Sequence, residues 1–306
     1  MRVFVTGATG FIGSAVVREL RAAGHPVLGL ARSEEAAGAL AQAGAEAHRG
    51  SLSDAESLAA GARACEGVIH LAFIHDFSQY KAAVETDLHA LEALSRALEG
   101  SNKPLVAASG TVMLTPGRIG TETDARASAN PFGGRAAAEE TLRSAANRGV
   151  RTSAVRLPPS VHGAGDQAFV PTLIDIARQK GFSAFIGDGA NRWPSVHRLD
   201  AARLFRLALE KAAPGALLHG VAEEGIPMRR IAETIGEGLG LPVRSIAASD
   251  AAAHFGWLAG FAALDNPTSS ALTQEWLGWR PRENPLLKDM REGGYFDGAQ
   301  RSKLLA

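Results

Sequence analysis

The sequence is short of several features that would each indicate a particular class of protein. It has one cysteine, Cys65, among 306 residues, which excludes an internal disulfide and a cysteine-based metal site and fits a reducing cytoplasm. Lys and Arg number 32, as do Asp and Glu, and this balance argues against a nucleic-acid or anionic-membrane surface. No apolar run could span a bilayer, and we expect no signal peptide because the chain opens on a strand. We therefore expect a cytoplasmic protein that binds neither nucleic acid nor membranes.

What the chain does have is a hydrophobic fraction of 46% and a dense glycine pattern at its N-terminus. Residues 1–5 form a short apolar run that is typical of a strand. Residues 6–13 follow at once and read Thr-Gly-Ala-Thr-Gly-Phe-Ile-Gly. Residues 14–23 then repeat at helical spacing, so the whole stretch predicts strand, glycine-rich turn and helix.

Each of the three glycines has a physical role in such a turn. Gly7 can adopt the backbone angles of a tight turn, Gly10 lets a pyrophosphate approach the backbone, and Gly13 lets the helix lie close on the strand. The N-terminus of the helix then offers unpaired N–H groups and the positive end of its dipole to the phosphates. The turn predicts a dinucleotide site that uses Thr6, Gly7, Thr9, Gly10, Phe11, Ile12 and Gly13.

The glycine spacing T-G-x-x-G-x-x-G resembles that of the short-chain dehydrogenase/reductase superfamily, and G-A-T-G-F-I-G is similar to its extended, epimerase/dehydratase-like branch. The resemblance covers nearly the whole chain. It implies an α/β fold, with a Rossmann doubly wound parallel sheet and a smaller C-terminal substrate-binding lobe. We expect residues 1–162 to form mainly the dinucleotide-binding domain, with its sheet completed by about 194–221, and residues 163–306 to form mainly the lobe.

The end of the second predicted strand, residues 25–31, bears on the choice of cofactor. A carboxylate there would hydrogen-bond the ribose 2′-hydroxyl and repel a 2′-phosphate, whereas an arginine accepts the phosphate. Positions 30–33 carry no acid, and Arg32 and Ser33 follow the strand. The sequence therefore favours NADP(H) over NAD(H), with a solvated surface arginine as the alternative interpretation of Arg32.

Two further stretches resemble cofactor contacts of the family. Residues 50–54 are similar to its G-D-L-x-D turn near the adenine, with Ser51 in place of the first aspartate and Leu52 in position to pack on the ring. Residues 67–73 resemble the strand V-I-H-L-A-A. Its end adds Leu71, Ala72 and Phe73 to the expected cofactor contacts. His70, inside that strand, is interpreted as a hydrogen-bonded core histidine and not as a catalyst.

The chain departs from the family where the proton donor should be. Ser109 falls on the family's serine that holds the substrate oxygen, and carbonyl-reducing members carry Y-x-x-x-K on the next helix. Phe132 and Ala136 stand at those two positions here, and phenylalanine has no proton to give. The two tyrosines, Tyr80 and Tyr295, do not lie four residues before a lysine. The resemblance therefore implies an atypical member that lacks the usual acid.

Other groups can take over part of this role. Ser109 can hydrogen-bond the substrate oxygen, and Thr111 can help it. The candidate proton donors are His75, Asp76 and His162, because a histidine pKa suits proton transfer near neutrality. Each of the three is also explicable as a structurally hydrogen-bonded residue.

Residues 187–200 are similar to the family stretch G-D-G-x-x-x-R-x-x-V-H-V-x-D. Arg192 matches an arginine that often touches the substrate in that branch. We expect Phe132, Arg192 and Trp193 to line the substrate site, and we expect no metal.

These observations predict an NADP(H)-dependent reductase that transfers hydride to a C=O or C=N group of a small organic substrate. Reduction of a protonated imine creates no alkoxide and needs only a site that tolerates a cation, such as one near Asp76 and Asp87. Two alternatives stay open. One is a nucleotide-sugar epimerase or dehydratase, although its first step needs a base where Phe132 stands; the other is a non-catalytic NADP(H)-sensing protein. In many relatives the helices that begin near Phe77 and Phe132 here pair subunits, so the resemblance also suggests a homodimer.

Overall fold

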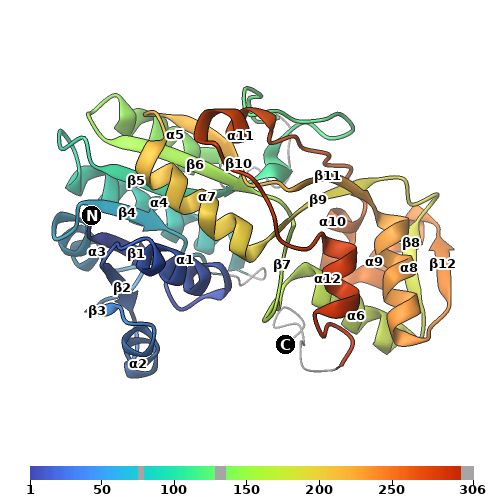
Figure 1. Cartoon of the computed structure of the whole chain (residues 1–306). Coiled ribbons are helices and arrows are strands. Elements are labelled where there is room, and N and C mark those ends of the chain that lie inside the picture. The colour runs from blue at the N-terminus through green and yellow to red at the C-terminus, as the bar shows by residue number, and fades with distance from the viewer. Residues whose placement is uncertain (75–78, 128–135, 298–306) are drawn as a thin grey trace.

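A seven-stranded parallel sheet forms the larger lobe of the computed structural model, which describes residues 1–74, 79–127 and 136–297 (Figure 1). The strands follow the order β10-β6-β5-β4-β1-β2-β3. They are β1 (Val3–Thr6), β2 (Val27–Ala31), β3 (Glu46–Arg49), β4 (Gly67–His70), β5 (Pro104–Gly110), β6 (Arg151–Leu157) and β10 (Ala216–His219). The order reverses between β1 and β4, and ligands of open parallel sheets bind at such a point, beyond the carboxyl ends of the strands.

Helices cover both faces of this sheet, which explains why its central strands β1 and β4 are buried along their whole length. One face carries α1 (Phe11–Ala22), α2 (Glu34–Gln42) and α7 (Arg198–Lys211), with α11 (Ala271–Leu277) beside α7. The other face carries α3 (Ala55–Arg63), α4 (Tyr80–Ala97) and α5 (Ala136–Ala146). The expected Rossmann doubly wound fold is confirmed. None of the described helices is both long and apolar enough to cross a membrane.

The second lobe is built on two small sheets and a separate hydrophobic core. One sheet contains β7 (Ser160–His162), β9 (Arg192–His197) and β11 (Glu223–Pro227), and the other pairs β8 (Ser183–Ile186) with β12 (Val243–Ile246). The helices are α6 (Phe169–Lys180), α8 (Met228–Leu239), α9 (Ala251–Phe255), α10 (Ala259–Ala262) and α12 (Leu286–Glu292). Figure 1 shows them gathered on one side of the large sheet.

The boundary between the lobes differs in one respect from the expectation that about 194–221 completes the large sheet. β10 does join that sheet, beside β6. β9 does not, because it pairs with β7 and β11 in the sheet of the second lobe. Pro158 and Pro159, which have no N–H to donate, follow the last residue of β6, and the chain continues as β7 in a new sheet.

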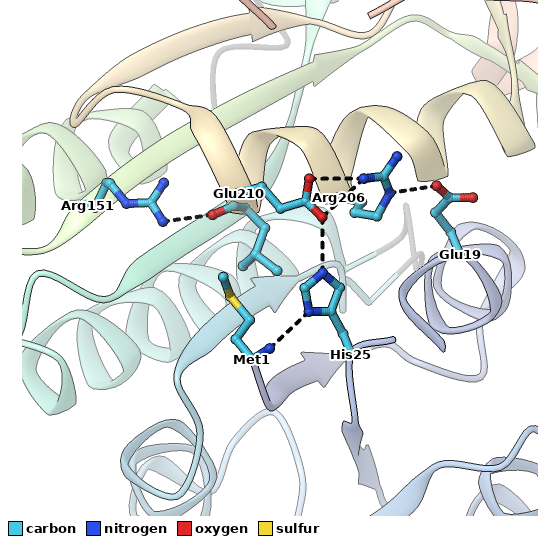
Figure 2. A network of polar contacts seen from close by, with 7 residues as sticks. Met1, Glu19, His25, Arg151, Arg206 and Glu210 are labelled. Carbon is cyan, nitrogen blue, oxygen red and sulfur yellow. Dashed lines mark hydrogen bonds and ion pairs between the residues drawn. The ribbon is translucent and has the colours of Figure 1, made fainter. Parts of the chain in front are cut away.

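A polar network fixes α7 against α1 and the N-terminus (Figure 2). Arg206 of α7 donates to Glu19 of α1 at 2.7 Å and to Glu210 at 2.9 Å. His25 lies between Glu210, 3.0 Å from its Nε2, and the amine of Met1, 3.1 Å from its Nδ1. Burial alone would raise the pKa of Glu210, but the hydrogen bonds from His25 and Arg206 outweigh it and lower that pKa. The helix that follows β9 is thus held on the helix that opens at the glycine-rich turn.

Candidate functional site

The turn between β1 and α1 is shaped by its glycines. Gly7 has a φ of +67°, and a Cβ there would lie 2.7 Å from the backbone nitrogen of Ala72. A Cβ on Gly13 would lie 1.9 Å from the carbonyl oxygen of Gly7. Gly10 is the N-cap of α1, so no side chain caps the first N–H groups, which lack partners within the helix. The turn has the shape and polarity that a dinucleotide pyrophosphate requires.

Thr6 and His70 hold this turn to the end of β4. The Thr6 hydroxyl oxygen accepts hydrogen bonds from the backbone N–H groups of Leu71 at 3.2 Å and Ala72 at 3.3 Å. Its own proton is then left for Nδ1 of His70, 2.8 Å away, and Nε2 of His70 donates to Asp87 at 3.1 Å. His70 is fully buried, so its interpretation as a hydrogen-bonded core histidine is confirmed.

The other expected cofactor residues follow β2, β3 and β4 along the same edge of the sheet. Arg32 is exposed, and within the described residues it forms no ion pair, while the Ser33 hydroxyl caps α2 by accepting from Ala36 at 3.2 Å. Ser51 and Leu52 are half-buried after β3. Thr9 and Gly10 are exposed, and Phe11, Ile12, Leu71, Ala72 and Phe73 are half-buried. Their contacts with a cofactor stay a prediction.

Ser109 belongs to a group of three polar residues at the end of β5. Its hydroxyl donates to Oε1 of Glu139, on α5, at 2.7 Å. Arg156 lies directly across from Ser109 on β6 and binds the same carboxylate with Nε at 2.9 Å and Nη2 at 2.7 Å. Glu139 and Arg156 also line a cavity of about 380 Å³ between α5, β6 and β10. The sequence analysis missed both, although an arginine that is buried inside a strand indicates that a partner carboxylate must exist.

Thr111, which was expected to assist Ser109, is fully buried. Its hydroxyl donates to the side-chain oxygen of Asn266 at 2.7 Å, and the Asn266 amide donates back to the Thr111 carbonyl at 3.0 Å. The pair joins the short turn after β5 to the segment that precedes α11. Thr111 therefore lies inside the protein with its proton engaged.

His162 is also buried, and its partners are residues of the second lobe and its boundary. Its Nδ1 lies 2.8 Å from Asp289 of α12, and its ring packs edge-on against His197 at a centroid distance of 5.3 Å. Burial, followed by the nearby His162, lowers the pKa of His197. The structure thus places His162 in a packed junction between β7, β9 and α12, where it contacts Asp289 and His197.

Tyr295, one of the two tyrosines, lies in the same junction. Its hydroxyl donates to Asp166 at 3.0 Å and accepts from the backbone of Gly163 at 3.0 Å. Burial raises the pKa of Asp166 to about 6, against hydrogen bonds from Ala168 and Tyr295 that lower it. Burial and the Asp166 charge raise the pKa of Tyr295, so this phenol keeps its proton and is not the missing acid.

Arg192 and Trp193 point in opposite directions from β9, as neighbours on a strand must. Arg192 binds Asp265 with Nε and Nη2, both at 2.9 Å, and its side chain is 36% exposed. Trp193 has no exposed surface and donates to the Phe261 carbonyl at 2.9 Å. The expectation that Trp193 lines the substrate site is therefore corrected, because this side chain is part of the lobe core.

Three of the predicted site residues, His75, Asp76 and Phe132, lie outside the described residues. Ala136 is the first residue of α5. The described part of the site therefore consists of the glycine-rich turn, the edge residues after β2 to β4, and the group at the end of β5.

A doubly wound sheet, a turn shaped for a pyrophosphate at its switch point and a second lobe beside it define a dinucleotide-binding α/β protein. The model of the NAD dependent epimerase/dehydratase family matches residues 3–218, and the chain belongs to this family of oxidoreductases. The resemblance to the extended short-chain dehydrogenase/reductases is thereby confirmed.

Known relatives cover most of the chain. An uncharacterized protein of Schizosaccharomyces pombe is 50% identical over 297 residues, which are 97% of this chain and 100% of the relative. The 4-hydroxy-2-methyl-3-oxo-4-farnesyl-3,4-dihydroquinoline-1-oxide ketoreductase of Stigmatella aurantiaca is 29% identical over 272 residues, 84% of this chain and 80% of that protein. A dTDP-glucose 4,6-dehydratase from Streptomyces venezuelae, solved with NAD bound, superposes with a TM-score of 0.78 at 21% identity, covers 98% of both chains and shows the shared fold.

Proposed function

We propose that the protein is an NADP(H)-dependent reductase that transfers hydride to a C=O or C=N group of a small organic substrate. The observation that carries this proposal is the position of Ser109. Its hydroxyl stands at the end of β5, two strands from the glycine-rich turn and at the same edge of the sheet. A serine there, next to a dinucleotide site, suits a substrate group that receives hydride.

Different residues of the site bind different parts of the cofactor. The N-terminus of α1 binds the pyrophosphate, and Arg32 binds the 2′-phosphate, because its exposed guanidinium forms no ion pair with any residue that the structure describes. Ser51 and Leu52 hold the adenine end, while the residues after β4, 71–73, lie along the path toward Ser109. When bound, the cofactor supplies the hydride and the protein supplies orientation.

The relatives support the reductase class to different degrees. The similar Stigmatella aurantiaca protein is a ketoreductase, which favours reduction of a small organic substrate. The Streptomyces venezuelae neighbour holds NAD, which keeps NAD(H) as the competing cofactor. That neighbour is itself a nucleotide-sugar dehydratase, and membership of the epimerase/dehydratase family favours the same second candidate. Phe132 stands against that candidate, because it cannot act as the base that starts sugar oxidation.

The test begins with binding. NADPH and NADH are titrated against the protein by cofactor fluorescence, and NADPH is expected to bind more tightly. NADPH oxidation is then followed by absorbance with ketones and cyclic imines matched in ring size. Turnover of either class supports a reductase, whereas tight binding without turnover, together with conversion of a nucleotide sugar, would support the second candidate.

A further inference from the structure

We infer that Ser109 meets the substrate as a hydrogen-bond acceptor, positioned by Glu139, so that the site favours a protonated C=N group over a C=O group. This inference rests on the proposed reductase function and narrows its substrate class. It also gives Glu139 and Arg156 a role that neither local spacing nor composition indicates.

The direction of the hydrogen bond between Ser109 and Glu139 is fixed by chemistry. A carboxylate can only accept, so the hydroxyl must donate across the 2.7 Å that separate Ser109 Oγ from Glu139 Oε1. A serine hydroxyl has one proton and two lone pairs. With its proton directed at Glu139, Ser109 has only lone pairs left to offer to a substrate.

Arg156 holds the Glu139 carboxylate in place beside Ser109. Its guanidinium donates to both carboxylate oxygens, at 2.9 Å and 2.7 Å, in the forked geometry that suits this pair. Nη1 of Arg156 donates to the Asp124 carbonyl at 3.0 Å and lies 3.5 Å from Nε2 of His219. The side chains of Arg156 and Glu139 are only 1% and 11% exposed, so the carboxylate cannot easily turn away from Ser109.

The hydroxyl of Thr111, just after the end of β5, also donates its proton within the protein. Thr111 donates to Asn266 at 2.7 Å and is fully buried. Ser109, which the family resemblance assigns to the substrate oxygen, and Thr111, which was expected to assist it, therefore both have their protons engaged. A carbonyl oxygen, which only accepts, would face the lone pairs of Ser109, whereas the N–H of a protonated imine would donate to them.

The reaction balances without an additional acid. Hydride brings two electrons to the carbon of the C=N–H⁺ group and forms the new C–H bond. The π electron pair of the C=N bond becomes the lone pair of nitrogen. The product is a neutral amine, the cofactor is left oxidised, and no proton has to be delivered during the step. This outcome agrees with the absence of a proton-donating tyrosine at position 132.

The test changes the acceptor of the Ser109 proton and measures the ratio of kcat/KM for a cyclic ketone to that for the matched cyclic imine. In the double variant Glu139→Leu with Arg156→Met, two apolar side chains replace the buried ion pair, and no unpaired charge is left. Ser109 is then free to donate. We expect the ketone-to-imine ratio to rise at least about tenfold, the size of effect typical of a hydrogen bond to a charged group.

A second variant keeps the shape of the Glu139 side chain and gives an independent measurement of the same ratio. Glu139→Gln replaces a charged acceptor by a neutral one, weakens the bond to Ser109, and should raise the same ratio about threefold. Glu140→Gln is the matched control, because Glu140 is the next residue of α5 but is exposed and paired with Arg143 on the surface. It should leave the ratio unchanged.

Ligand binding gives a readout that does not depend on turnover. Calorimetry with NADP⁺ present compares a saturated cyclic amine, which has N–H donors, with the cyclic ketone. Ser109→Ala should weaken binding of the amine much more than that of the ketone, while the Kd for NADPH stays the same. A purely structural role of the group would change both ligands alike.

The outcomes separate this inference from the proposed function. A wild-type protein that prefers imines, with a ratio that shifts in the Glu139 variants, supports both. A wild-type preference for ketones, or an unchanged ratio in a folded Glu139 variant, overturns the inference and leaves the reductase standing. No turnover of either class by NADPH-bound protein contradicts the proposed function and the inference with it.

Discussion

Tyr295 donates its hydroxyl proton to Asp166 across 3.0 Å, although the two residues are 129 positions apart in the chain. The same hydroxyl accepts the N–H of Gly163, so one side chain near the end of the described residues binds two points of the loop that follows β7. Asp166 is almost completely buried there, and its proton equilibrium is coupled to folding.

We expect Asp166 to make stability decline as the pH rises. Burial raises its pKa from 3.8 to about 6 in the folded protein, so between these values the native state holds a proton that the unfolded chain has released. The free energy of unfolding then falls with pH by up to about 3 kcal/mol across this window. Denaturant unfolding near pH 4 and pH 7 should show this decline in the wild type and not in Asp166→Asn. A difference between the two proteins that does not vary with pH would contradict the assignment.

The hydrogen bonds of the Thr6 hydroxyl, which join the glycine-rich turn to the end of β4, predict an effect on stability. Thr6→Val would remove the hydroxyl that serves the Ala72 N–H and Nδ1 of His70, whereas the Leu71 N–H would keep its second bond, to the Thr6 carbonyl oxygen at 3.3 Å. We expect a loss of about 2–4 kcal/mol in the free energy of unfolding, measured by chemical denaturation. Thr6→Ser keeps the hydroxyl and is the control; an equal loss in both variants would show that packing of the methyl group, not the hydrogen bonds, is responsible.

The glycine-rich turn predicts a sharp contrast between two helical glycines. In Gly13→Ala the new Cβ would lie 1.9 Å from the Gly7 carbonyl oxygen, so the turn must open, and NADPH affinity should fall more than about tenfold. Gly38, in α2, has nothing within 4 Å of its Cβ position, and Gly38→Ala should leave binding unchanged and stabilise the helix by about 0.5–1 kcal/mol. Fluorescence titration of both variants decides the matter; unchanged affinity in Gly13→Ala would rule out the turn as the phosphate site.

Arg32 predicts the choice of cofactor. Arg32→Ala removes a charge that would otherwise bind the 2′-phosphate, so the Kd for NADPH should rise about tenfold or more while that for NADH changes little. In the wild type, the affinity for NADPH should fall at high salt, because salt screens the attraction between the exposed arginine and the 2′-phosphate. A parallel rise for both cofactors would mean that Arg32 supports the strand end without reading the phosphate.

The fold was predictable because its signals are local. The glycine pattern at 7, 10 and 13 and the apolar strands mark the doubly wound sheet within short windows of sequence. Even the boundaries follow local chemistry: α1 begins at Phe11, earlier than the helical repeat indicates, because Gly10 serves as its N-cap. The partner of a strand is less local, and β9 was assigned to the wrong sheet for this reason.

The candidate site was harder to predict because its bonds join distant residues. Ser109 was found by resemblance, but its acceptor lies 30 positions away and the partner of Thr111 lies 155 positions away. The hydrophobic periodicity of a sequence does not indicate which distant residues will form such pairs. Trp193 was predicted to line the substrate site but lies in the core of the lobe. Alternation along a strand does not say which face meets the core when both neighbours are large.

The position of β10 has a consequence for how this protein can be divided. The large sheet is closed at one edge by a strand that the chain reaches only after it has built β7, α6, β8 and β9 of the smaller lobe. Neither lobe is a contiguous piece of sequence, so neither can be excised and produced alone by cutting the gene at one point. In such an architecture, substrate range changes through substitutions and through loop insertions between fixed strands. It cannot change by exchange of a whole terminal domain, because neither lobe is one.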